Sequence, residues 1–123
     1  MNYLKSIIRN SKQANELKKC LENIGSTVHL QQLVGGAYSL YVADAVEQME
    51  GIHILLSDNS DNAAYMLNDL YELLDAERVV YFASGYKRSA AYGTEDAQGV
   101  VHRTATLNAI KNFKDPRAAS RRL

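Results

Sequence analysis

The order of apolar runs and helical segments between residues 28 and 83 is the feature that most constrains the fold. Residues 28–34, 52–56 and 78–83 are runs of strand length; residues 52–56 are apolar throughout except for His53, whereas residues 28–34 mix apolar and polar side chains. They alternate with residues 37–49 and 61–74, in which apolar side chains recur at helical spacing. A strand–helix–strand–helix–strand order with short connections favours a parallel sheet with helices packed on it. We therefore expect an α/β fold with a small parallel sheet flanked by helices.

Three regions follow from the patterning along the chain. Residues 1–26 form an N-terminal helical segment, since apolar residues recur at helical spacing within it. Residues 27–113 form the expected α/β core, which includes a long loop over residues 84–99 and a last helix over residues 100–113. Residues 114–123 have the only proline and little apolar content, which predicts either a frayed tail or a truncation end.

Composition bounds the class of protein. The chain has 123 residues, 46% of them hydrophobic, and a formal net charge of zero. A chain without a global basic field is a poor nonspecific binder of nucleic acid. No apolar run is long enough to span a membrane, and the N-terminus lacks the pattern of a signal peptide. With a single cysteine, Cys20, no internal disulfide can form, so we expect a cytoplasmic protein without membrane contact.

The charges are nevertheless segregated. Residues 40–77 have nine acidic side chains and no Lys or Arg, whereas residues 1–39 and 78–123 are both net basic. This layout leaves room for contacts between parts of the chain or with partners, but charge runs of this kind favour the alternative, a solvated acidic helix face.

The turn between the first predicted strand and the first predicted helix can be placed on the P-loop pattern GxxxxGK[ST]. On that pattern Tyr38 stands at the lysine, and Ser39 keeps the hydroxyl position that contacts magnesium. Because a lysine neutralises the β- and γ-phosphates and a tyrosine cannot, we expect a degenerate P-loop without ATPase activity, within a partial P-loop NTPase (RecA-like) layer. A plain strand, Gly-Gly turn and helix is the alternative. The degenerate motif comprises Gln32, Gly35, Gly36, Ala37, Tyr38 and Ser39.

Three segments of the chain resemble the N-terminal UvrB-like region, domain 1a, of the bacterial transcription-repair coupling factors (Mfd). The first is HLQQLVGGAYSLYVADAV, the second IHILLSDNSDNAAYMLNDL and the third VVYFASGYKRSAAYGTEDAQGVVHRTATLNAI. Together they cover roughly residues 29–110. The match depends on their order and spacing, because none of the three motifs is specific alone.

The resemblance implies a scaffold role in nucleotide excision repair of DNA damage. Members of this family are ATP-dependent DNA translocases that displace stalled RNA polymerase and recruit the excinuclease component UvrA. By resemblance, this chain is a non-catalytic scaffold that supports UvrA recruitment and self-inhibition of the full-length protein. The motor and the main UvrA contact belong to parts of the family's protein beyond these residues. The excinuclease component UvrA, RNA polymerase and DNA are thus partners of the full-length protein.

Two further functions remain open at the level of the sequence. A small P-loop-like protein could bind a nucleotide or phosphate through Gly35, Gly36 and Ser39. Alternatively, the long loop combines aromatic rings with cations, as single-stranded nucleic-acid and protein interfaces do. An exposed loop that packs its tyrosines on the sheet edge is the interpretation that we favour for it. Open sheet edges also favour self-association. The candidate partner or nucleic-acid surface comprises Tyr86, Lys87, Arg88, Tyr92 and Arg103.

No catalytic residue, cofactor or metal site is predicted. The three histidines lie in different predicted elements without the spacing of metal ligands.

Overall fold

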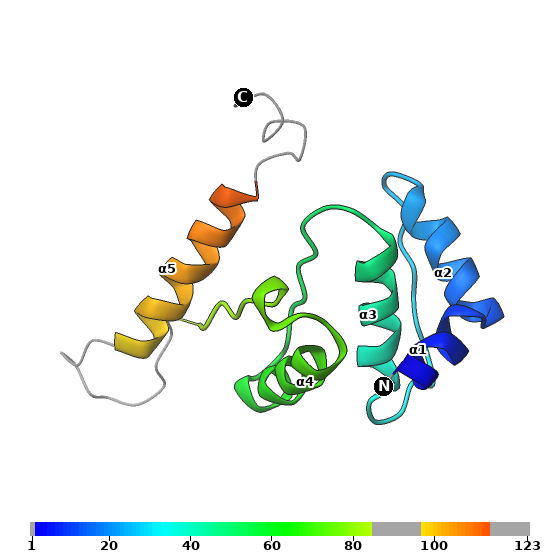
Figure 1. The fold of residues 1–123 in the computed structure, drawn as a ribbon, viewed down its shortest axis with the longest axis horizontal. Helices are drawn as coiled ribbons and strands as arrows, with labels where there is room; N and C mark the ends of the chain where they lie inside the picture. Colours follow the sequence, from blue (N-terminus) through cyan, green and yellow to red (C-terminus); the bar gives the residue numbers. More distant parts are fainter. Residues whose placement is uncertain (1, 85–96, 114–123) are drawn as a thin grey trace. The chain divides into compact units, whose positions relative to one another are not determined.

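The computed structural model describes residues 2–84 and 97–113 (Figure 1). The chain divides into two compact units, Met1–Ala76 and Glu77–Leu123.

The first unit is built around α3 (Ala37–Gln48), which contacts each of the other three helices of the unit. These are α1 (Asn2–Arg9), α2 (Lys12–Glu22) and α4 (Ser60–Leu73). Figure 1 shows α1 and α2 in blue, α3 in cyan-green and α4 in green. A single 3-10 turn, η1 (Ala76–Arg78), follows α4. Helix α3 is therefore the central element of this unit.

Capping side chains explain where two of these helices begin. The Ser11 side chain accepts a hydrogen bond from the Ala14 backbone N–H at the start of α2. Asn59 does the same for the Asn62 N–H at the start of α4, with 2.8 Å between Asn59 Oδ1 and the nitrogen. Such caps satisfy backbone donors that have no partner inside the helix. The helices predicted over residues 37–49 and 61–74 are confirmed, with boundaries shifted by one residue.

The core of the first unit is small. Its buried apolar side chains come from three helices, and among the described residues no large side chain is completely buried. Ala43 of α3 is fully inaccessible. Its small side chain allows the neighbouring helices to approach α3 closely. The other buried apolar residues are Ala14, Leu17, Leu70 and Leu73.

The predicted parallel sheet is wrong for this structure. Residues 28–34, 52–56 and 78–83 form no strand, and none occurs elsewhere in residues 2–84 and 97–113. Apart from Arg78, which ends η1, each run is instead an irregular connection. A run of apolar, β-branched residues favours an extended backbone, but a strand exists only when a neighbouring strand supplies hydrogen-bond partners. No such pairing is made here, so the α/β class and the partial P-loop NTPase layer are both replaced by an all-helical arrangement of the described residues.

In the second unit, α5 (Ala97–Asn112) packs on the chain segment that precedes the undescribed residues. The Thr106 hydroxyl, in a residue only 7% exposed, lies 2.9 Å from both the Tyr81 carbonyl oxygen and the His102 carbonyl oxygen. The rings of Tyr81 and His102 meet edge to face, with centroids 5.8 Å apart. The last predicted helix is thus confirmed, and a buried hydroxyl fastens it to residues 81–83.

Candidate functional site

The turn that was placed on the P-loop pattern lies at the start of α3. Gly35 has a φ of +59° and Gln32 a φ of +60°, so the backbone twice enters the left-handed region before the helix begins. The Ala37 N–H donates to the Val34 carbonyl oxygen at 3.2 Å and closes the turn. Gly36 is the N-cap and provides no side-chain cap. The predicted Gly-Gly turn and helix start are therefore present, although no strand leads into them.

Ser39 does not present its hydroxyl to solvent. It is 4% exposed, and its Oγ donates a hydrogen bond of 2.9 Å to Oδ2 of Asp69 on α4. The same carboxylate oxygen lies beside the turn, since a Cβ added to Gly36 would be 3.9 Å from it. A carboxylate near a helix N-terminus interacts favourably with the helix dipole and repels a phosphate. The negative charge at this helix start is thus supplied by the protein itself.

The other motif residues add no cation to the turn. Tyr38 is 38% exposed, Gln32 is exposed and Ala37 is half-buried. The six residues of the predicted degenerate motif lie together because they are consecutive or nearly so in the chain. A turn of this composition has backbone amides and an acidic neighbour but lacks the positive charge that triphosphate binding requires.

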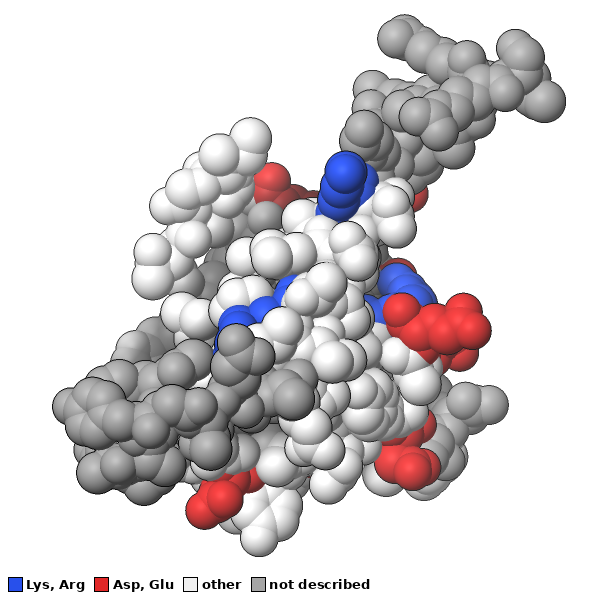
Figure 2. Space-filling view, turned by 90° about the vertical axis from the view of Figure 1, so that its left-hand side faces the viewer, with Lys and Arg blue, Asp and Glu red and all other residues white. Residues whose placement is uncertain are grey.

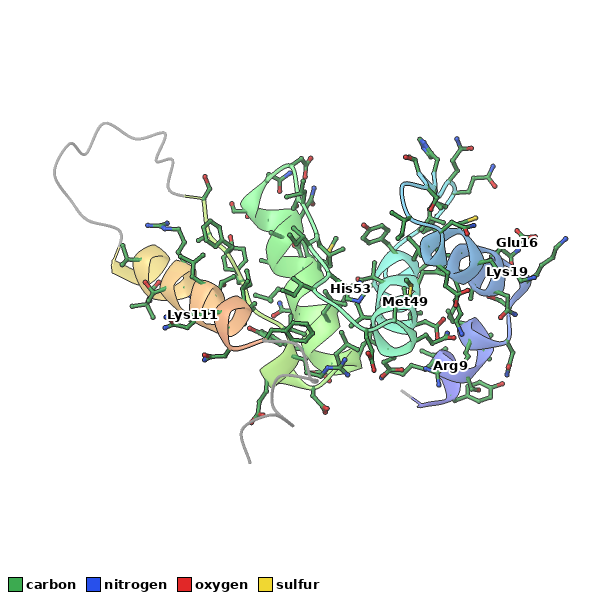
Figure 3. All side chains as sticks on the ribbon, turned by 90° about the horizontal axis from the view of Figure 1, so that it is seen from above. Arg9, Glu16, Lys19, Met49, His53 and Lys111 are labelled. Atoms are coloured by element: carbon green, nitrogen blue, oxygen red, sulfur yellow. The ribbon has the colours of Figure 1, made fainter. Side chains whose placement is uncertain are left out.

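A second polar cluster joins α1 to α3. Arg9 Nε lies 3.1 Å from Oδ1 of Asp44, and Arg9 Nη2 lies 2.7 Å from Oε2 of Glu47. Lys5 Nζ contacts the other oxygen of Glu47 at 2.7 Å. Gln48 Nε2 donates to Oδ2 of Asp44 at 2.7 Å. Asp44 is 5% exposed, so this pairing compensates a buried carboxylate. Figure 3 labels Arg9 on α1.

The pairing shifts two ionisations. Hydrogen bonding to Asp44 is the largest influence on Arg9, and the pKa of its guanidinium is raised above the ordinary value. Partial burial acts to raise the pKa of Glu47, but the hydrogen bonds and charges of Lys5 and Arg9 outweigh it, and the net pKa of Glu47 is lowered. Both shifts favour the charged forms, as expected for paired ions.

The predicted partner or nucleic-acid surface is not assembled by the described residues. Four of its members, Tyr86, Lys87, Arg88 and Tyr92, lie outside them. Arg103 is half-buried, and its Nη1 donates to the Ala83 carbonyl oxygen at 3.4 Å. Arg103 therefore helps to hold α5 on residues 81–83.

Two residues at the centre of these clusters were missed by sequence reasoning. Asp69 and Asp44 lie on predicted helices, and in the sequence each has the appearance of an ordinary charged residue on a solvent-facing side of its helix. Their partners Ser39 and Arg9 are 30 and 35 positions away, so no local spacing signals either contact.

Two classes of site are lacking in the described part of the chain. Residues 2–84 and 97–113 contain no group of three or more His, Cys, Asp or Glu side chains placed to hold a metal ion. None of the helices in these ranges has both the length and the apolar character needed to cross a membrane.

Comparison of this chain with protein-family models, with curated proteins and with solved structures gives no match.

Proposed function

We propose that this chain is a non-catalytic scaffold within a bacterial transcription-coupled DNA repair factor. It supports recruitment of the excinuclease component UvrA and self-inhibition of the full-length protein, and it neither binds nor hydrolyses ATP. The family assignment in this proposal rests on the resemblance of the three segments within residues 29–110.

The single observation that supports the non-catalytic role best is the hydrogen bond from Ser39 to Asp69. The hydroxyl that would contact magnesium is buried and donates to a carboxylate of the protein. Tyr38 occupies the position of the lysine, and no Lys or Arg occurs between residues 20 and 77. A triphosphate at this turn would meet a carboxylate and no cation, which disfavours binding electrostatically.

Titration of the whole chain with ATP and magnesium, followed by calorimetry, tests the absence of nucleotide binding. We expect no binding heat and no change in the thermal midpoint. Micromolar binding that disappears in Ser39→Ala would identify a small nucleotide-binding protein and would contradict the proposal.

The repair role is tested in a full-length factor that carries this chain. Arg9→Met removes one of the two cations that pair α1 with α3, the one that also holds the buried Asp44, and we expect it to raise basal DNA-dependent ATP hydrolysis and to lower capture of UvrA. Lys12→Met is the control, because within residues 2–84 and 97–113 the Lys12 ammonium pairs only with Glu16, at an exposed position. Unchanged hydrolysis and capture in a folded Arg9→Met factor would contradict a scaffold role.

A further inference from the structure

The connection between α3 and α4 leaves several large apolar side chains exposed. Ile52, Ile54 and Leu56, at alternate positions, are 49%, 76% and 91% exposed. Leu55 is also exposed, at 38%. Three consecutive alternate positions of this size are unusual on a free surface, because burying each would be favourable.

The backbone of residues 52–56 is equally unpaired. Its N–H and C=O groups make no hydrogen bond within residues 2–84 and 97–113. The His53 side chain bonds through Nε2 to the Met49 carbonyl oxygen at 3.1 Å, which uses no main-chain group of residues 52–56. Figure 3 labels both residues. Residues 52–57 form no helix, turn or bend, and none of residues 52–56 has a positive φ, whereas Gly51 directly before them has a φ of +129°. Residues 52–56 therefore have main-chain donors and acceptors available to a partner.

The contrast with residues 81–83 shows that such a segment can be covered. There, the carbonyl oxygens of Tyr81 and Ala83 accept hydrogen bonds from side chains of α5. Within the part of the chain that the structure describes, no helix side chain donates to the carbonyl oxygens of residues 52–56, although this segment is also apolar. In Figure 2 much of the visible surface is white, the colour of uncharged residues, with separate red acidic and blue basic groups.

The charges that flank the segment are all acidic. Glu50 precedes it, Asp58 and Asp61 follow it, and the four ion pairs of the described residues involve none of these three. The Asn62 side chain donates a hydrogen bond to the Asp58 carboxylate and lowers the pKa of Asp58, which favours its charged form. An extended partner with basic residues at both ends would complement these charges.

A second copy of the segment is a poor partner. In an antiparallel pair centred on Ile54, Glu50 of each copy would lie opposite Asp58 of the other. Like charges directly opposite each other across a strand pair are destabilising. The charge pattern therefore favours a different, basic sequence over self-pairing.

We infer that residues 52–56 form a docking segment for an extended peptide whose apolar centre is flanked by Arg or Lys, bound through main-chain hydrogen bonds by strand addition. This inference deepens the interaction role proposed above and rests on it. Their tests are separable: ATP hydrolysis would contradict the scaffold and say nothing of peptide binding, and failure to bind the peptide would leave the scaffold without this docking segment.

The probe is a fluorescein-labelled synthetic peptide of alternating Val and Thr with two Arg at each end, titrated with the whole chain and followed by anisotropy. We expect saturable binding that weakens as salt rises. Replacing the terminal Arg residues by Glu, or methylating alternate backbone nitrogens of the peptide, should each lower the affinity about tenfold or more.

Matched variants locate the site. Leu56→Ser should weaken binding about tenfold, whereas Ile24→Ser, at an equally exposed apolar position elsewhere in the same unit, should leave it unchanged. Ile54→Thr provides a second test if Leu56→Ser alters the circular dichroism spectrum. Absence of binding, equal binding of the Glu-ended or methylated peptide, or insensitivity to both variants overturns the inference. So does a dimer in sedimentation that is lost in Leu56→Ser, because the occupant would then be a second copy.

Discussion

Ser39 Oγ on α3 donates a hydrogen bond of 2.9 Å to Asp69 Oδ2 on α4, and this contact ties together two helices that are separated by 11 residues of irregular chain. The serine is buried, whereas the aspartate residue as a whole remains exposed. The bond thus fixes the side of α4 that faces the start of α3, and it gives the Gly35–Gly36 turn an acidic neighbour.

Ser39→Ala should lower the free energy of unfolding by about 1 kcal/mol, because Asp69 loses one hydrogen bond but regains water. Denaturation with urea, followed by circular dichroism, measures the change. Thr27→Ala is the control, since Thr27 is exposed and has no hydrogen-bond partner in the described part of the chain, and it should stay near the parent stability. Equal stability of the two variants would show that the Ser39–Asp69 bond contributes nothing.

Arg9→Met should destabilise the first unit by about 2 kcal/mol, because it leaves the buried carboxylate of Asp44 with Gln48 as its only partner among the described residues. The estimate is kept modest because the Arg9 side chain is 48% exposed. Lys12→Met removes only a surface pair and should cost less than about 0.5 kcal/mol.

A double-mutant cycle separates pairing from other effects of the Arg9 substitution. In Arg9→Met combined with Asp44→Asn, we expect a total loss smaller than the sum of the two single losses, because both changes remove the same contact. Strict additivity would mean that the two side chains do not interact energetically.

The lowered pKa of Glu47 predicts a loss of stability in acid. The unfolded chain takes up the Glu47 proton near the ordinary value of 4.5, before the folded chain does. The contribution is therefore fully present above pH 4.5 and is lost as the pH falls through the lowered pKa of the folded state. Urea midpoints between about pH 7 and about pH 3 should fall less steeply in Glu47→Gln than in the parent chain. Parallel curves would contradict this assignment.

Tyr38→Lys should not create ATP hydrolysis. Gln32 and Ala37 stand where the pattern has its two fixed glycines, and the Asp69 carboxylate remains beside Gly36 after the substitution. Phosphate release with ATP and magnesium is the measurement, with Tyr38→Met as the control for removal of the ring. Turnover in Tyr38→Lys that is lacking in Tyr38→Met would show that a single cation restores the chemistry.

Helices were predictable because their signals are local. The apolar spacing of residues 61–74 and the capping character of Asn59 lie within a few positions of one another, and α4 forms there. The absence of the expected strands was not predictable in the same way. The apolar run at residues 52–56 indicates a tendency to extend, but it does not say whether a second strand lies beside it. Hydrogen bonding between strands needs a second backbone brought from elsewhere in the chain, and the described residues provide none to this run.

The sequence by itself determined the positions of the helices, the absence of a cation at Tyr38 and the acidic character of residues 40–77. Only the tertiary structure decided that Ser39 gives its hydroxyl to Asp69, that Asp44 is buried against Arg9 and that Ile54 and Leu56 stay exposed. The physical reason is the distance along the chain over which each interaction acts. Helical periodicity and caps act over one or two turns, whereas burial and pairing depend on side chains 30 or more positions apart that meet only when the chain has packed.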